Sequence, residues 1–212
     1  MDLIEHATPV LAAPGANGAP GLLPAMTGAE QSLLRAAAEG RRAGLEFGCG
    51  GSTGLLLQAG LPRLLSADSD LAWLGRVRED PRCGEAAAAG RLRLLHVDIG
   101  PTGPWGWPTD PAAMPRWPAY WRDPWEAAGA VDLVLVDGRF RVACALAGVP
   151  RLGADAVLLV HDFWQRASYQ PPVLRHFDLL GSAGTLVLLA PRLPIDVAAL
   201  AVDLAAHGFD PG

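Results

Sequence analysis

Acidic side chains recur in this sequence where apolar runs end. Five such runs end at or near a carboxylate, and these acids are Glu46, Asp68, Asp98, Asp137 and Asp162. If the runs are parallel strands, their C-terminal ends share one edge of a sheet, which is where open α/β folds bind their ligands. Like charges in one cleft are costly, so this pattern predicts a cationic ligand or a metal ion among them.

Asp137, His161 and Asp162 are the candidate catalytic residues at this edge. An unperturbed imidazole titrates near ~6.5, so His161 could act as a general base that Asp162 orients. The alternative is a histidine satisfied by the backbone at the end of a buried strand. Arg139 and Arg141 could anchor an anionic substrate, although arginines that are solvated or associated with a helix are the commoner outcome.

A glycine-rich loop lies between the first apolar run and a helical pattern. Glycines at 48, 50 and 51 allow a ligand to approach the backbone, and the helix N-terminus that follows suits a carboxylate or a phosphate. The dinucleotide fingerprint requires a third glycine where Thr53 stands. Glu46 would repel a pyrophosphate but suits a ligand that carries a positive charge beside its carboxylate. A purely structural turn is the other interpretation.

The acids after the second and third runs suggest a nucleoside. Asp68 follows Gly48 by 20 residues, the spacing at which an acid accepts hydrogen bonds from ribose hydroxyls, and Asp98 could accept one from the amine of adenine. Either acid could instead be an ordinary surface residue. Together with the loop they favour S-adenosylmethionine over a dinucleotide. The candidate cofactor-binding residues are Glu46, Gly48, Cys49, Gly50, Ser52, Thr53, Asp68, Ser69, Asp98, Ile99 and Asp137.

At these positions the chain resembles the class I S-adenosylmethionine-dependent methyltransferases. Residues 46–50, 67–70, 96–99 and 133–138 look like their first four motifs, in order and at the family's spacing. Residues 136–141 and 161–166 look like a small bacterial group of methyltransferase-like proteins of undefined function. The resemblance implies methyl transfer to a small molecule, and the alternative is a non-catalytic module that binds S-adenosylmethionine or a nucleotide.

Departures from two branches of this family narrow the expected chemistry. The branch that needs a cation carries an Asp-Asn pair where this chain has Asp162 and Phe163, and no lysine follows Asp137, so a metal site between Asp137 and Asp162 is open but lacks a ligand, and no metal-binding residue is assigned. The Asn/Asp-Pro-Pro-Tyr motif of the amino-methylases is replaced by Asp137-Gly138-Arg139. O-methylation is therefore favoured over methylation of nitrogen or carbon.

The alternation of apolar runs and helical patterns predicts an α/β fold. We expect a doubly wound, mostly parallel seven-stranded sheet with an antiparallel strand in the closing hairpin and helices on both faces. The expected strands are 43–47, 63–67, 92–97, 131–136, 156–160, 177–180 and 185–189. The expected helices are 27–39, 53–59, 71–78, a tryptophan-rich region ending near 128, 140–152, 173–176 and 195–207.

Composition bounds the remaining possibilities. The 212 residues are 50% apolar and fit one domain, residues 25–212, after a flexible arm at 1–24 that is rich in Pro, Gly and Ala. All 17 basic residues are arginine, which excludes Schiff-base lysines and Walker loops. A net charge of −5 without a basic run argues against nucleic acid, and the lack of a long apolar run argues against a membrane span.

Two further expectations concern the setting of the protein and its aromatic residues. Three cysteines without Cys-x-x-Cys spacing indicate a reducing cytoplasm. There the chain would act on a small-molecule acceptor, either as a monomer or as a homodimer. Five of the seven tryptophans lie between residues 105 and 125. They could form a lid or an aromatic pocket, or pack onto the sheet or another subunit.

Overall fold

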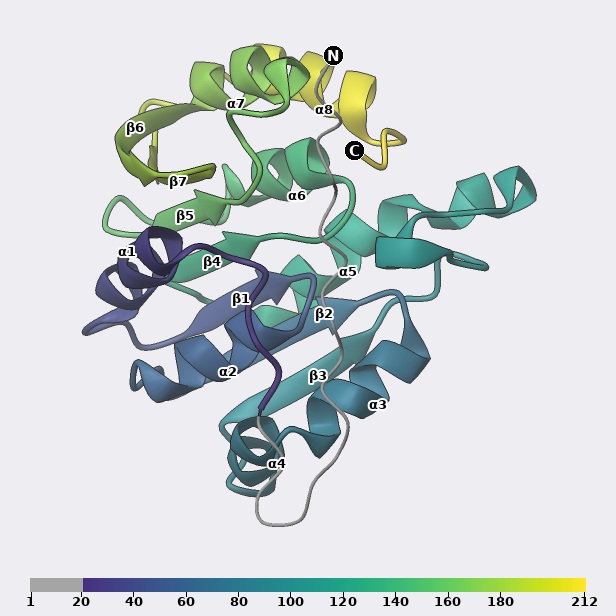
Figure 1. Ribbon diagram of the computed structural model, residues 1–212. Helices are drawn as coiled ribbons and strands as arrows, with labels where there is room; N and C mark the ends of the chain where they lie inside the picture. Colours follow the sequence, from purple (N-terminus) through teal and green to yellow (C-terminus); the bar gives the residue numbers. More distant parts are fainter. Residues whose placement is uncertain (1–20) are drawn as a thin grey trace, which may run out of the picture.

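The computed structural model describes residues 21–212, which fold around a seven-stranded sheet (Figure 1). The predicted arm at 1–24 lies outside the described residues apart from 21–24. The strands run in the order β3-β2-β1-β4-β5-β7-β6. Their bounds are β1 Gly44–Phe47, β2 Leu64–Asp68, β3 Leu92–His96, β4 Leu133–Val136, β5 Val157–Val160, β6 Phe177–Ala183 and β7 Leu186–Pro191.

The pairing of the strands confirms the predicted fold class. All pairs among β1 to β5 are parallel, while β7 runs antiparallel to both β5 and β6. Strand order reverses between β1 and β4, because β2 and β3 extend the sheet to one side of β1 while β4 and β5 extend it to the other. Such a switch point opens a crevice at the C-terminal ends of the strands, and that is where a ligand site is expected.

Eight α-helices cover the two faces of the sheet in the described part of the chain. They are α1 Gly28–Ala38, α2 Gly51–Gln58, α3 Leu71–Glu79, α4 Pro81–Ala88, α5 Pro118–Ala128, α6 Arg141–Gly148, α7 Gln170–His176 and α8 Val197–His207. Leu133 and Leu135 of β4 pack in the core formed by α1 to α4, whereas Val134 and Val136 pack in the core formed by α5 to α8. Burial on both faces explains why the strand is apolar throughout rather than alternating.

Two elements differ from the sequence prediction. Helix α4 was not predicted, although Asp80 caps it by accepting a hydrogen bond from the Arg82 N–H and Pro81 occupies its first turn. Strand β6 continues past the predicted break as far as Ala183, with a register shift between Leu179 and Gly181. A β-bulge accommodates such an extra residue without ending the strand.

The tryptophan-rich region divides into two parts, one of which packs onto the sheet as one of the predictions had it. Its first part forms two short 3₁₀ turns, Pro104–Gly106 and Pro111–Arg116, and its second part is helix α5. Tyr120 and Trp125 of α5 are buried against the sheet, whereas Trp105 and Trp107 in the first part are exposed. The helix therefore belongs to the core, and the turns project from the sheet edge (Figure 1).

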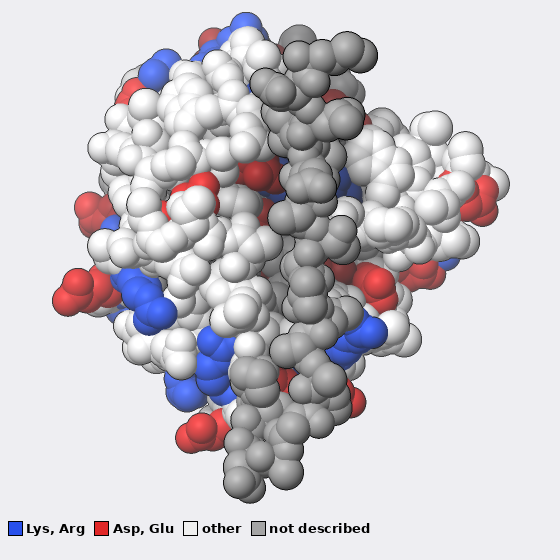
Figure 2. Space-filling view, in the orientation of Figure 1, with Lys and Arg blue, Asp and Glu red and all other residues white. Residues whose placement is uncertain are grey.

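Within residues 21–212, every helix is too short or too polar to cross a lipid bilayer. Arginine and acidic side chains are interspersed over the face shown in Figure 2 rather than gathered by sign.

Candidate functional site

The glycine loop meets strand β4 at the switch point of the sheet. Gly48 has a φ of +86°, and a Cβ there would lie 2.5 Å from the backbone nitrogen of Gly138. A Cβ on Gly138 would in turn lie 2.1 Å from the Tyr120 hydroxyl. Both positions therefore need glycine, since only glycine lets the ends of β1 and β4 approach so closely. At Gly50, by contrast, a Cβ would make only an ordinary contact with Trp73, at 3.6 Å.

Glu46 supports this loop from beneath. Its side chain is fully buried, and its carboxylate accepts hydrogen bonds from the hydroxyls of Ser52 and Thr53, both at 2.6 Å, and from Ser66. Burial raises the pKa of Glu46 to about 7, against the opposing effect of these hydrogen bonds. The polar groups of Glu46, Ser52 and Thr53 are therefore hydrogen-bonded to one another. Their burial disfavours the direct contact with a ligand that the sequence predicts for them.

Asp68 lies beside the loop at the end of β2. One carboxylate oxygen accepts from the Cys49 N–H at 3.2 Å and the other from the Asp70 N–H at 2.9 Å. Burial raises the pKa of Asp68. The neighbouring Ser69 hydroxyl is buried and has no hydrogen-bond partner among the described residues. Burial also raises the pKa of the Cys49 thiol, so Cys49 is a small packing residue rather than a nucleophile.

Asp98 and Ile99 follow β3 and differ sharply in environment. Ile99 is fully buried in the core, whereas the Asp98 carboxylate is exposed. Asp98 accepts a hydrogen bond from the Gly100 N–H at 2.9 Å, which lowers its pKa, and pairs with Arg116 at 2.5 Å. The structure therefore places Asp98 at the outer rim of the same edge, where Arg116 competes with any ligand for its carboxylate.

His161 and Asp137 form a pair where β5 and β4 end side by side. The Nδ1 atom of His161 lies 2.9 Å from Oδ1 of Asp137, and Asp162 lies beside them with Oδ1 3.7 Å from the same nitrogen. Burial alone would lower the pKa of His161, but the hydrogen bond and charge of Asp137 outweigh it, so the pKa is raised. The three predicted catalytic residues are therefore brought together.

Arg141, at the start of α6, pairs with both aspartates. Its Nη2 lies 3.2 Å from Asp137 and its Nη1 lies 3.0 Å from Asp162, while its guanidinium also donates to the carbonyls of Asp137, Gly138 and His161. Asp137, His161 and Asp162 could each offer one metal ligand within 4.8 Å of the others. Since the buried guanidinium of Arg141 already pairs with both carboxylates, a divalent ion would have to compete with Arg141 for them.

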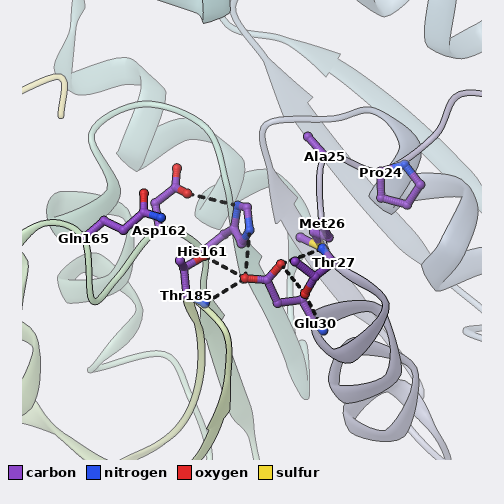
Figure 3. A pocket seen from close by; sticks show the side chains of 9 residues that line it. All are labelled: Pro24, Ala25, Met26, Thr27, Glu30, His161, Asp162, Gln165 and Thr185. Atoms are coloured by element: carbon purple, nitrogen blue, oxygen red, sulfur yellow. Dashed lines mark hydrogen bonds and ion pairs between the residues drawn. The ribbon is translucent and has the colours of Figure 1, made fainter. Parts of the chain in front are cut away.

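An open pocket of about 470 Å³ lies beside this cluster (Figure 3). It is lined by Pro24, Ala25, Met26, Thr27, Glu30, His161, Asp162, Gln165 and Thr185. Glu30 of α1 faces Nε2 of His161 at 3.6 Å, on the side of the ring opposite Asp137. Its carboxylate accepts hydrogen bonds from Thr27 and Thr185, and although burial alone would raise its pKa, these bonds lower it to about 2.

Glu30 and Thr185 are site residues that sequence reasoning missed. The pattern around Glu30 predicts a capping box with Thr27, and the structure contains that box. The same carboxylate also reaches Thr185, which is 155 positions further along the chain, so α1 is fastened to the turn between β6 and β7. A local pattern cannot reveal that second role.

The last residues of the predicted arm cross the glycine loop. A Cβ on Gly51 would lie 2.2 Å from the backbone of Leu23 and Pro24. The Leu22 N–H donates to Asp80 at 2.6 Å, and Arg82 donates back to the Leu22 carbonyl at 2.7 Å. Residues 22–24 are therefore fixed over the start of α2 and connect the glycine loop to the pocket.

Solved structures show where this architecture occurs. The chain is similar to a methyltransferase-like protein from Silicibacter pomeroyi, with 32% identity over 90% of this chain and 99% of that one, at a TM-score of 0.77. It shares its fold with a methyltransferase from Geobacter sulfurreducens, at 17% identity over 80% of this chain and 82% of that one, with a TM-score of 0.52. No protein-family model and no curated protein matches the chain.

A third structure with this fold was solved with a bound ligand. The N-methyltransferase NodS from Bradyrhizobium japonicum, solved with S-adenosyl-L-homocysteine, has 14% identity over 76% of this chain and 83% of that one, at a TM-score of 0.50. The fold is thus that of the class I, Rossmann-like methyltransferases. Because the Silicibacter protein shares 32% identity over almost its full length, this chain belongs to the methyltransferase-like proteins of that class, as the sequence predicted.

Proposed function

We propose that this protein binds S-adenosylmethionine at the glycine loop and transfers its methyl group to a hydroxyl oxygen of a small molecule. Membership of the methyltransferase-like family supports the cofactor and the reaction class. The paired side chains of His161 and Asp137, beside an open pocket, support transfer to an oxygen, because a hydroxyl must lose a proton when it is methylated.

The residues at the switch point fit such a ligand. Gly50 leaves room beside the loop, and Asp68 and the buried Ser69 hydroxyl, which is unpartnered within residues 21–212, offer polar atoms to a ribose. Asp68 and Asp137 lie beside this loop, and their carboxylates would favour a positively charged sulfonium. The Asp137 N–H is bonded to the Phe47 carbonyl at 2.8 Å, so that acid is held beside the end of β1.

The chemistry required of the protein is positioning and removal of one proton. When bound, S-adenosylmethionine would supply a methyl group activated by its sulfonium: the acceptor oxygen would form a bond to the methyl carbon in line with the carbon–sulfur bond that breaks, and S-adenosylhomocysteine would leave. Neutral His161 accepts the hydroxyl proton at Nε2 while Asp137 holds Nδ1 and stabilises the resulting imidazolium. Glu30 lies on the Nε2 side and favours the same charged form. Charge therefore develops between two carboxylates that are already in place.

The hydrogen bond between His161 and Asp137 carries this assignment, and it is tested in two steps. Calorimetry of the full chain with S-adenosylmethionine, S-adenosylhomocysteine and NAD should show binding of the first two only. Formation of S-adenosylhomocysteine from a mixture of hydroxylated metabolites should then fall by about 10²–10⁴-fold in His161→Asn, with cofactor affinity unchanged. Equal turnover by His161→Asn would contradict the role of His161.

A non-catalytic module that binds the same ligand is the second candidate. It is favoured by the ion pairs of Arg141 with Asp137 and Asp162, because both carboxylates already have a partner without a substrate. Ligand binding without turnover on any acceptor in the mixture would identify this candidate.

A further inference from the structure

Arg139 is a buried arginine without an ion-pair partner in the described part of the chain. Only Arg139 and Arg141 are buried among the described arginines, and Arg141 pairs with two aspartates. Arg139 forms no ion pair within residues 21–212, and its Nε atom is buried without a hydrogen-bond partner there. A buried charge without a partner is strongly unfavourable, so this position requires a compensating anion.

The guanidinium of Arg139 lies beside Trp107, Arg166 and Gly212. Its Cζ lies 5.5 Å from the centre of the Trp107 ring, and the Cζ of Arg166 lies 5.6 Å from the centre of the Tyr169 ring. A Cβ built on Gly212 would lie 3.2 Å from Nη1 of Arg139 and 3.5 Å from Nη1 of Arg166. The two guanidinium groups are therefore neighbours beside Gly212.

Tyr169, whose ring lies beside Arg166, carries a second buried polar atom without a partner in the described part of the chain. The Tyr169 side chain is almost wholly buried, and its hydroxyl has no hydrogen-bond partner among the described residues. The charges of Arg141, Arg166 and Arg139 all act on that hydroxyl. The nearby acid Asp210 accepts from the Gly212 N–H at 3.1 Å and forms no ion pair with either arginine.

Neither Arg139 nor Arg166 forms an ion pair within residues 21–212, and their positive charges repel each other. Burial lowers the pKa of Arg139, and the positive charges of Arg141 and Arg166 lower it further. A guanidinium binds a carboxylate or a phosphate through two parallel hydrogen bonds, and a phenol hydroxyl can add a third. Arg139, Arg166 and Tyr169 together thus offer what a planar or tetrahedral anion needs.

We propose that Arg139, Arg166 and Tyr169 bind a carboxylate or phosphate group carried by the methyl acceptor. The assignment to the acceptor rests on the proposed function, whereas the anion site rests on the three residues alone. Arg139 follows Asp137 by two residues, so the site lies on the same rim as the His161 pair. An acceptor held by its anionic group would project its hydroxyl towards His161.

The site is tested on the full-length protein with inorganic phosphate and acetate as probes. We expect either probe to raise the melting temperature more than sodium chloride at equal ionic strength, since a ligand that binds the folded form stabilises it. Calorimetry should show a saturable affinity that falls by at least about tenfold in Arg139→Gln and in Arg166→Gln. The matched control is Arg122→Gln, which removes an exposed arginine paired with its neighbour Asp123 and should change nothing.

Each outcome decides between the possibilities. Equal stabilisation by chloride and by both probes in the wild type would overturn the site, as would unchanged affinity in both arginine variants. If Arg139→Gln fails to fold, Arg166→Gln and Tyr169→Phe provide the same comparison. S-adenosylmethionine affinity is measured in parallel. If the wild type does not bind S-adenosylmethionine, the proposed function is refuted, whereas the anion site is still decided by the phosphate and acetate measurements. Phosphate affinity above acetate affinity would identify a phosphorylated acceptor, and the reverse a carboxylate.

Discussion

Replacing Glu30 by Gln should destabilise the protein by an amount that depends strongly on pH. Hydrogen bonds from Thr27 and Thr185, at 2.7–2.9 Å, lower the pKa of Glu30 from 4.5 to about 2. Because the pKa is lower in the folded chain, the stabilisation is complete above the unfolded pKa and is lost as pH falls through the folded one. The shift corresponds to roughly 3 kcal/mol at pH 7 and to less than half of that near pH 3.

Urea unfolding of the wild type and Glu30→Gln at pH 7, 5, 4 and 3 measures this difference. Other carboxylates also titrate in this range, so the gap between the two proteins, rather than either curve, is the quantity to follow. Glu79→Gln is the control, since Glu79 is exposed at the end of α3. A gap that stays constant with pH, or one no larger than that of the control, would refute the anchoring of α1 to the turn between β6 and β7 by a charged Glu30.

Three further predictions address the site. The rate of methyl transfer should rise with pH through the raised pKa of His161. In Asp137→Asn this rise should occur at lower pH, because the variant lacks the charge that raises the pKa of His161, and a rise at unchanged pH would exclude His161 as the titrating base. Burial raises the pKa of Glu46, so the wild type should lose stability as pH rises through about 7. In urea unfolding, the free energy of unfolding of Glu46→Gln should gain roughly 3 kcal/mol relative to that of the wild type between pH 4 and pH 8, and a difference that does not change with pH would contradict this. Removing the guanidinium in Arg141→Ala should cost about 3–5 kcal/mol and leave Asp137 and Asp162 free, so Mn²⁺ should raise the melting temperature of this variant but not of the wild type; an equal rise in both would show that Arg141 does not hold the cation position.

The sequence was sufficient for the fold because its patterns are local and repeated. Runs such as Leu133 to Val136 are apolar at every position, and each is followed by a helical pattern, which specifies a parallel sheet covered on both faces. Helix α4 escaped prediction because its apolar stripe consists only of Cys83 and Ala86. Strand β6 escaped in part because Gly181 resembles a turn residue, although it pairs with Leu188 of β7.

The site was less predictable, because its contacts join distant parts of the chain. The convergence of Asp137, His161 and Asp162 follows from strand polarity alone. Which acids face a ligand does not follow, since Glu46 and Asp98 end equivalent strands yet one is fully buried beneath the loop and the other is paired at the outer rim. Glu30 could not be found at all, because its interaction with His161 depends on how α1 docks against the sheet.

The distribution of charge along the rim constrains the orientation of any acceptor. Glu30 and Asp162 line the pocket at His161, whereas Arg139 and Arg166 lie beside Gly212. Arg141 pairs with Asp137 and Asp162, so its charge is not free for an acceptor. An anionic acceptor would be repelled by Glu30 and attracted by Arg139, so only one end of it can lie near each. Opposite charges at these two places would therefore fix which hydroxyl of the acceptor reaches His161.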